Sequence, residues 1–514
     1  MTAFVGALLL ETRVQARYGI IAVAALLTVL WTAVLLAVPA GVARSVAPLL
    51  LLVDTATFGA LLIAGLLLFE RTEGSRSALA VTPLSTVSYL AAKLVSLTSL
   101  SVLSAVPILL AATRGEAGAL PQGLVGVALA TLLFLAIPLS LAARSVDLMR
   151  FLVLVPIPVV PLLLVPLAYQ VGLLEHPGAF VVPTTATMEL LRHTVAPETT
   201  LLSFGWLAAS LIYLTASCVV LGAVALRQLR AEFASPPPRA TMPAATPSAA
   251  SPSAASHERS RPAEGTSERG GGGVFAALVR IDAAGVGRDL VLVVFVAAPI
   301  LLALALRFGY APAVDYVDAR FGVDLAPHLP VALAVLVLLH VALMVGSVGA
   351  LRLIEDADDG TLLVLRASPA SLTGYFAYRL GVTSLAAVGG LAIAVPLSGL
   401  APGGWDAQLL VAAGLSAAQA PLVMLAVTAT AGNKVEALAV LKLGGGVMLL
   451  PVLIWSLPGT TAWLLAWLPP FWAAQAALGT PAAPLWGSVA AGVVLTTAMG
   501  AALLRRTTTR LTQR

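Results

Sequence analysis

The chain has 514 residues, of which 59% are hydrophobic and only 10% are charged, and its mean hydropathy is +0.99. Soluble proteins carry about 25% charged residues, so this composition excludes an ordinary soluble domain. The formal net charge is +5, and Cys218 is the only cysteine. One cysteine excludes internal disulfides and thiolate metal sites. The sequence contains no basic patch with interleaved aromatic residues, so it does not predict nucleic-acid binding.

The chain opens with an amphipathic stretch over residues 2–17. On a helix, its apolar residues lie opposite Glu11 and Arg13. Helices of this type lie in the plane of the membrane interface; the alternative is a polar extension of the first span. The stretch 274–288 opens a second half in the same way, since Phe4, Glu11 and Arg17 match Phe275, Asp282 and Arg288.

Twelve apolar runs are long enough to cross a bilayer, which takes about 20 helical residues. The first half contains runs over 19–38, 47–69, 87–112, 121–143, 151–173 and 201–226. The second half contains runs over 289–306, 329–350, 373–397, 405–431, 435–456 and 483–504. The first run is longer than the roughly 7–15-residue core of a cleaved signal peptide, so we expect it to be retained.

Asp54 lies inside the second predicted span, and His340 occupies the equivalent place in the second half. Each lies about 24 Å along a helix from the acid that ends its span. An ionisable side chain inside a span is costly and usually faces a cavity or a partner. We therefore interpret Asp54 and His340 as a pair across the pseudo-symmetry axis, acting as a gate latch or substrate contact. The alternative is that each is hydrated at the outer interface.

One polar motif occurs twice, directly after the second span of each half. Residues 70–93 read ERTEGSRSALAVTPLSTVSYLAAK, and residues 356–379 read DADDGTLLVLRASPASLTGYFAYR. A self-similar pattern at one spacing predicts a duplicated structural unit. The matched residues are Glu70 with Asp356, Glu73 with Asp359, Gly74 with Gly360, Pro83 with Pro369, Tyr89 with Tyr375, and Lys93 with Arg379.

In each copy an acid ends the span and a short polar helix follows. Pro83 or Pro369 ends that helix, because proline lacks an amide donor and restricts the residue before it. We expect a short helix across the cytoplasmic face that transmits the movement of a soluble partner to the spans. The alternative is a tight, solvated turn.

Residues 231–273 are rich in Pro, Ala, Ser and Gly and cannot form a core. We interpret them as a disordered cytoplasmic linker between a first six-span half, residues 1–230, and a second, residues 274–514. Most of the 29 Lys and Arg residues then lie on the side of the linker, as the positive-inside rule requires. We expect a multi-pass protein of the cytoplasmic membrane with both termini and the linker inside.

The predicted fold is therefore an all-α polytopic membrane protein. Its twelve transmembrane helices form two parallel six-helix repeats, each with an amphipathic N-terminal interfacial helix and a cytoplasmic helix. An acidic outer loop, 307–328, follows the first span of the second half. Between the fifth and sixth spans, Pro183 matches Pro469 and Glu189 matches Gln475.

The duplicated motif resembles the permease subunits of ABC transporters of the ABC-2 type, the type-2 exporters. The shared pattern is acidic–x–x–acidic–Gly, then Ser/Thr-Pro-x-Ser, then Tyr, then Lys/Arg. The amphipathic entry helix and the Pro-containing outer segment also fit, and the resemblance covers both halves without the linker. It implies two half-permeases fused in one chain.

The resemblance also implies roles for residues. Glu70–Pro83 and Asp356–Pro369 are then coupling helices that seat in two copies of a separate ABC ATPase subunit. Residues 2–17 and 274–288 are connecting helices near the ATPases. The segments 175–199 and 458–482 are short outer helices that close a gate, which makes gate or substrate contacts of Pro183, Glu189, Pro469 and Gln475.

The chain lacks a Gly-x-x-x-x-Gly-Lys-Ser/Thr phosphate loop, because the GGGG at 270–273 is followed by Val274. We expect no catalytic residue, metal or cofactor in this chain, with ATP and Mg²⁺ bound by the partner ATPase. The expected function is export of a hydrophobic or amphiphilic small molecule, such as a drug, an antibiotic or a lipid. One alternative is a twelve-span secondary transporter driven by an ion gradient, which leaves the amphipathic entry helices unexplained. Another is a membrane-integral lipid enzyme, which needs more clustered acids and histidines than Asp54 and His340 supply.

Overall fold

The computed structural model describes residues 3–72, 84–118, 120–143, 145, 151, 154–170, 174, 176–197, 204–234, 280, 290–321, 324–358, 360–362, 365, 372–447, 463–479 and 484–512. All regular elements in these ranges are helices. Nine helical stretches among them are long and apolar enough to cross a membrane, and each overlaps one predicted span. The other three predicted spans overlap α3 (Ala40–Thr72), α8 (Pro156–Gln170) and α19 (Lys434–Val447). The all-helical membrane class is confirmed, whereas twelve spans in two parallel repeats stay a prediction.

The first-half helices begin and end at residues that favour helix boundaries. Gly19 separates α1 from α2 because its φ of 70° is left-handed, a conformation that glycine adopts without a Cβ clash. Val38 is extended before Pro39, as proline requires, and separates α2 from α3. The other helices are α1 (Ala3–Arg17), α2 (Ile20–Ala37), α5 (Thr86–Ala112), α6 (Leu120–Ala142), α9 (Thr184–Val195) and α10 (Phe204–Ala234), with a 3₁₀ turn at Pro177–Val181.

In the second half, the predicted span 405–431 is divided at Ala418. Pro421 explains the break, because it lacks an amide hydrogen and its ring crowds the carbonyl of Ala417. A π-helical stretch at Ala334–Leu339 joins α13 to α14. The helices are α12 (Leu290–Phe321), α13 (Leu329–Leu333), α14 (His340–Asp358), α16 (Leu372–Ser398), α17 (Ala407–Ala417), α18 (Gln419–Thr430), α22 (Pro469–Leu478) and α23 (Leu485–Thr512), with 3₁₀ turns at Ala326–His328 and Trp463–Leu465.

The predicted outer loop at 307–328 is wrong for most of its length. The helix α12 continues to Phe321 and includes Pro312. The segment is exposed as expected, with Phe308 72% exposed. The fall in hydropathy after residue 306 marks the end of the apolar stretch and not the end of the helix, because the Ala, Tyr and Arg residues beyond it tolerate a helical backbone.

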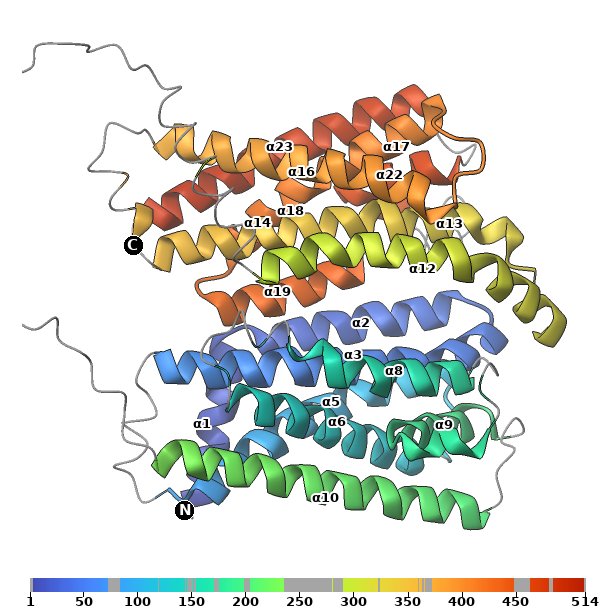
Figure 1. Cartoon of the computed structure of the whole chain (residues 1–514), viewed down its shortest axis with the longest axis vertical. Helices are drawn as coiled ribbons and strands as arrows, with labels where there is room; N and C mark the ends of the chain where they lie inside the picture. Colours follow the sequence, from blue (N-terminus) through green and yellow to red (C-terminus); the bar gives the residue numbers. More distant parts are fainter. Residues whose placement is uncertain are drawn as a thin grey trace, which may run out of the picture.

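The two halves form neighbouring groups of helices that meet at α2, α3 and α19 (Figure 1). The blue-to-green helices of the first half lie below the yellow-to-red helices of the second. Gly446 of α19 comes very close to α2, since a Cβ atom there would lie 2.7 Å from the Leu30 side chain. Buried side chains from all three helices form one cluster: Ile20, Val23, Ala24, Leu27, Leu66, Val435 and Ala439.

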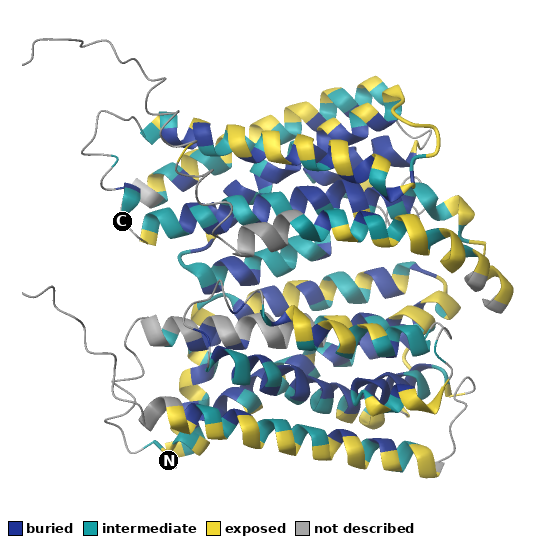
Figure 2. Ribbon diagram, viewed as in Figure 1, coloured by how far each residue is buried: buried dark blue, intermediate teal, exposed yellow. Residues whose placement is uncertain are grey.

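Burial separates central spans from outward-facing ones. Of the 18 most apolar consecutive residues of α10 or α23, only 11% are buried, against 56% for α6 and 61% for 326–358. In Figure 2, exposed residues recur along the described part of α10. Its exposed residues include Ile212, Val219 and Val220, an apolar surface that suits lipid chains rather than water. Both chain ends lie on one side of the molecule (Figure 1).

Candidate functional site

Glu70, Tyr89 and Lys93 of the repeated motif form a buried cluster in the first half. Lys93 Nζ lies 2.6 Å from Glu70 Oε1 and 2.8 Å from Glu11 Oε1. The Tyr89 hydroxyl donates a short hydrogen bond to Glu70. Lys93 is fully buried, so two carboxylates take the place of water as partners of its ammonium group. This cluster joins α1, α3 and α5 at one end of the bundle.

The equivalent residues form the same arrangement in the second half. Arg379 Nη2 lies 2.5 Å from Asp356 Oδ2, and the Tyr375 hydroxyl donates a short hydrogen bond to that oxygen. Arg379 Nε also donates to the Tyr375 hydroxyl oxygen at 3.1 Å. The duplicated motif therefore builds one acid–tyrosine–base cluster in each half. Each cluster fixes the end of one helix to the start of the next.

The helix α1 crosses the ends of the spans and does not continue α2 (Figure 1). It buries Ala7, Glu11 and Gln15, which lie on one face, and Gln15 Nε2 donates to Ser96 Oγ at 2.8 Å. Burial raises the pKa of the Glu11 carboxyl above its usual value, although Lys93 opposes this. The predicted separate entry helix is present, with its acid turned toward the protein. Most of the second-half stretch 274–288 lies outside the described residues.

In each copy of the motif, the structure describes only part of the polar segment between the acid and the tyrosine. Gly360 has a φ of 72° and follows α14 by two residues, the left-handed position that favours glycine after a helix. Leu362 is buried in a cluster with Leu353, Tyr375 and Phe376. The coupling role of this element stays a prediction. The remaining predicted coupling residues lie outside the described residues: Glu73, Gly74, Pro83, Asp359 and Pro369.

Asp54 forms an ion pair with Lys442, where sequence symmetry predicts a pairing with His340. Lys442 Nζ lies 3.0 Å from Asp54 Oδ1 and donates to the Asp54 carbonyl oxygen at 3.1 Å. The two side chains are 18% and 9% exposed. His340 begins α14, directly after the π-helical stretch, a distortion that often marks functional sites. A gate or substrate role for Asp54 and His340 stays a prediction.

The two predicted outer helices are present as α9 and α22. Pro183 precedes the first residue of α9, and Pro469 is the first residue of α22, where proline is favoured. Both helices are buried along most of their length. α9 packs against α3, α6, α8 and α10, and α22 against α17 and α23.

Glu189 of α9 and Gln475 of α22 occupy matching places in the two halves, and both are buried. Glu189 Oε2 lies 3.5 Å from Arg192 Nη1. Burial raises the pKa of the Glu189 carboxyl, although Arg192 and Tyr169 oppose the shift. An acid thus stands in one half where a neutral amide stands in the other. Their role at a gate stays a prediction.

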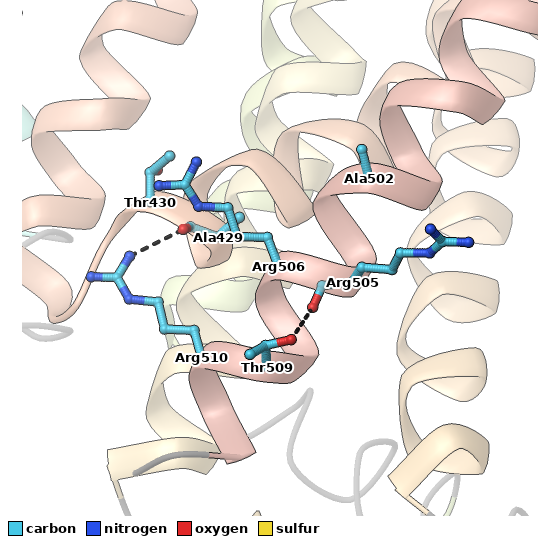
Figure 3. A pocket seen from close by; sticks show the side chains of 7 residues that line it. All are labelled: Ala429, Thr430, Ala502, Arg505, Arg506, Thr509 and Arg510. Carbon is cyan, nitrogen blue, oxygen red and sulfur yellow. Dashed lines mark hydrogen bonds between the residues drawn. The ribbon is translucent and has the colours of Figure 1, made fainter.

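A basic pocket of about 620 Å³ lies between the C-terminal ends of α18 and α23 (Figure 3). Arg510 Nη1 donates to the Ala429 carbonyl oxygen at 3.1 Å, which satisfies one of the free carbonyls at the end of α18. Arg505 points away from this bond, and Arg506 lies beside Thr430 (Figure 3). The remaining lining residues are Ala502 and Thr509.

Two family models match the chain in tandem. Residues 2–233 match a model described as the fluoroquinolones export permease protein family. Residues 282–504 match a model described as fluoroquinolones export permease protein Rv2686c-like. The two matched ranges lie on either side of the stretch that we interpret as a linker.

Curated relatives come from Mycobacterium tuberculosis. The fluoroquinolones export permease protein Rv2686c is 31% identical over 238 residues, which cover 45% of this chain and 92% of that protein. The fluoroquinolones export permease protein Rv2687c is 31% identical over 191 residues, which cover 37% of this chain and 80% of that protein. With most of each relative covered at this identity, the chain belongs to the fluoroquinolones export permease protein family.

Proposed function

We propose that this chain is the transmembrane permease of an ATP-driven drug exporter of the ABC-2 type, with two half-permeases fused in one polypeptide. Two separate ATPase subunits bind its cytoplasmic face and hold ATP and Mg²⁺. The cargo is an amphiphilic drug, and the names of the relatives favour fluoroquinolones. The fusion is supported by the coverage, since less than half of this chain matches most of each relative.

The observation that carries this proposal is the pair of matching clusters, Glu70–Tyr89–Lys93 and Asp356–Tyr375–Arg379. Each cluster joins the helix that enters a polar element to the helix that leaves it. A push on that element therefore moves two spans as one body, which is the geometry of a rigid-body switch. Two ATPases that close together move both halves and change the side to which the cargo site opens.

Charge distribution supports the cytoplasmic placement of the polar elements. Arg505, Arg506 and Arg510 gather at the C-terminal end of α23 (Figure 3). Basic residues near the ends of spans favour the cytoplasmic side. The linker and both termini then lie on the side where the ATPases are found.

The test is drug uptake into inverted membrane vesicles from cells that produce the chain together with a candidate ABC ATPase. We expect accumulation of norfloxacin that requires ATP and is lost when the Walker lysine of the ATPase is replaced. Drug transport by the purified chain alone in liposomes, driven by a proton gradient, would instead establish the secondary transporter and overturn the proposal.

A further inference from the structure

We propose that Asp54 and Lys442 form the site that recognises a zwitterionic drug. The ammonium group of the drug replaces Lys442 beside Asp54, and its carboxylate replaces Asp54 beside Lys442. The inference rests on the proposed drug export, and it adds the charge class of the cargo and the two residues that distinguish it. A fluoroquinolone with a piperazine ring belongs to this class, since it carries one carboxylate and one ammonium group near neutral pH.

The position of the pair fits a site that opens and closes. Asp54 belongs to α3 of the first half and Lys442 to α19 of the second, and these helices pack where the halves meet. Both side chains are largely buried. A movement of one half against the other therefore separates the two charged groups and makes both available to a ligand.

The pair occurs once, although most features of this chain occur twice. At the spacing of 286 residues that relates the halves, Asp54 corresponds to His340 and Lys442 to Pro156. The second copy therefore has neither the acid nor the base. By contrast, the acid–tyrosine–base clusters occur in both halves. A bond that supports the fold of each half is expected twice, whereas one cargo site at the junction needs only one pair.

Charge balance explains the preference for a zwitterion. A ligand with both charges replaces one ion pair by two, so every charge keeps a partner. A ligand with only an ammonium group satisfies Asp54 but takes the Asp54 carboxylate away from Lys442. An unpaired buried charge is strongly unfavourable inside a protein or a bilayer, so singly charged analogues bind more weakly.

The test measures equilibrium binding to the full-length chain in lipid nanodiscs. The probes are norfloxacin, its decarboxylated analogue and its N-acetylpiperazine analogue, which lacks the ammonium group. We expect the unsubstituted chain to bind norfloxacin at least about 10-fold more tightly than either analogue. Lys442→Met abolishes the preference over the decarboxylated drug, and Asp54→Asn abolishes the preference over the acetylated drug.

A matched control is available on the same helix. Lys434 of α19 lies 3.3 Å from Glu355 of α14 and is 27% exposed, so Lys434→Met removes the same charge away from the site and leaves both preferences intact. If the single variants fail to fold, the exchange Asp54→Lys with Lys442→Asp preserves the pair and retains both preferences. Unchanged preferences in Lys442→Met and Asp54→Asn overturn the site. Absence of binding of all three compounds to the unsubstituted chain overturns the proposed cargo itself.

Discussion

Lys93 of α5 and Glu70 of α3 form an ion pair of 2.6 Å, and the residues that match them, Arg379 and Asp356, form one of 2.5 Å in the second half. The base lies 23 positions after the acid in both copies. The two copies differ in how the base is satisfied. Lys93 binds a second carboxylate, that of Glu11, while Arg379 binds the Tyr375 hydroxyl through its second nitrogen.

Replacement of Lys93 by methionine should destabilise the first half. Lys93 has no exposed surface and lies between two carboxylates, the buried one of Glu11 and the 16% exposed one of Glu70. Its removal leaves these acids without a counter-ion, at a cost of about 3–5 kcal/mol in the free energy of unfolding. Thermal unfolding of the purified chain in detergent checks this, with Lys434→Met as the partly exposed control that costs under about 1 kcal/mol. Equal shifts in the two variants would contradict a special role for Lys93.

Each tyrosine should stabilise the cluster of its own half. Tyr89 and Tyr375 each donate a hydrogen bond to the acid of their cluster. Phenylalanine retains the ring but removes that bond, which is worth about 1.5–3 kcal/mol when the acceptor is charged. We expect Tyr89→Phe to lower stability by this amount and Tyr375→Phe by at least as much, because Tyr375→Phe also removes the acceptor of the Arg379 Nε hydrogen bond. The double variant should show the sum, since the clusters lie in different halves. A large loss of stability from only one of the two substitutions would show that the tyrosine hydrogen bond stabilises only one half.

Much of the fold is predictable because hydropathy and boundary residues agree. The runs at 19–38, 87–112 and 121–143 became α2, α5 and α6 almost residue for residue. The motif alignment also contained the clusters, since tyrosine and base lie four positions apart on one helix and therefore share a face. The alignment could not show that the acid of one helix contacts the base of another, because contact between separate helices depends on how they pack.

The parts that could not be predicted depend on tertiary contacts. Symmetry suggests a pairing of Asp54 with His340, but symmetry fixes only equivalent positions. The ion pair between Asp54 and Lys442 depends on how α19 packs on α3. Glu11 was expected on the polar face of an interfacial helix, yet Lys93 draws it inward. The extension of α12 beyond the apolar run likewise has no hydropathy signal.

The contact between the halves should be sensitive to volume at Gly446 and insensitive at Gly445. A Cβ atom at Gly446 would lie 2.7 Å from Leu30 and 2.9 Å from Leu27, whereas nothing lies within 4 Å of one at Gly445. We expect Gly446→Val to destabilise the chain by about 1–3 kcal/mol through overpacking. Gly445→Val is the matched control and should be nearly neutral. Thermal unfolding compares the two, and equal stability would mean that α2 and α19 are not held as closely as described.

The stability of Glu189→Gln relative to the unsubstituted chain should increase as the pH rises. Burial raises the pKa of Glu189 above 4.5 in the folded protein, so the folded state holds this proton more tightly than the unfolded chain does. Its contribution to stability is therefore complete below about pH 4.5 and is lost as the pH rises through the folded-state pKa.

Glutamine, the residue at the matching position 475, has no proton to lose. The Tm of Glu189→Gln minus that of the unsubstituted chain should therefore increase between about pH 4 and pH 8. Gln475→Glu is the reciprocal test, since it introduces an acid at a buried position and should lower the Tm most at high pH. A Tm difference that stays constant across this range would mean that Glu189 has the same proton affinity in the folded and unfolded states.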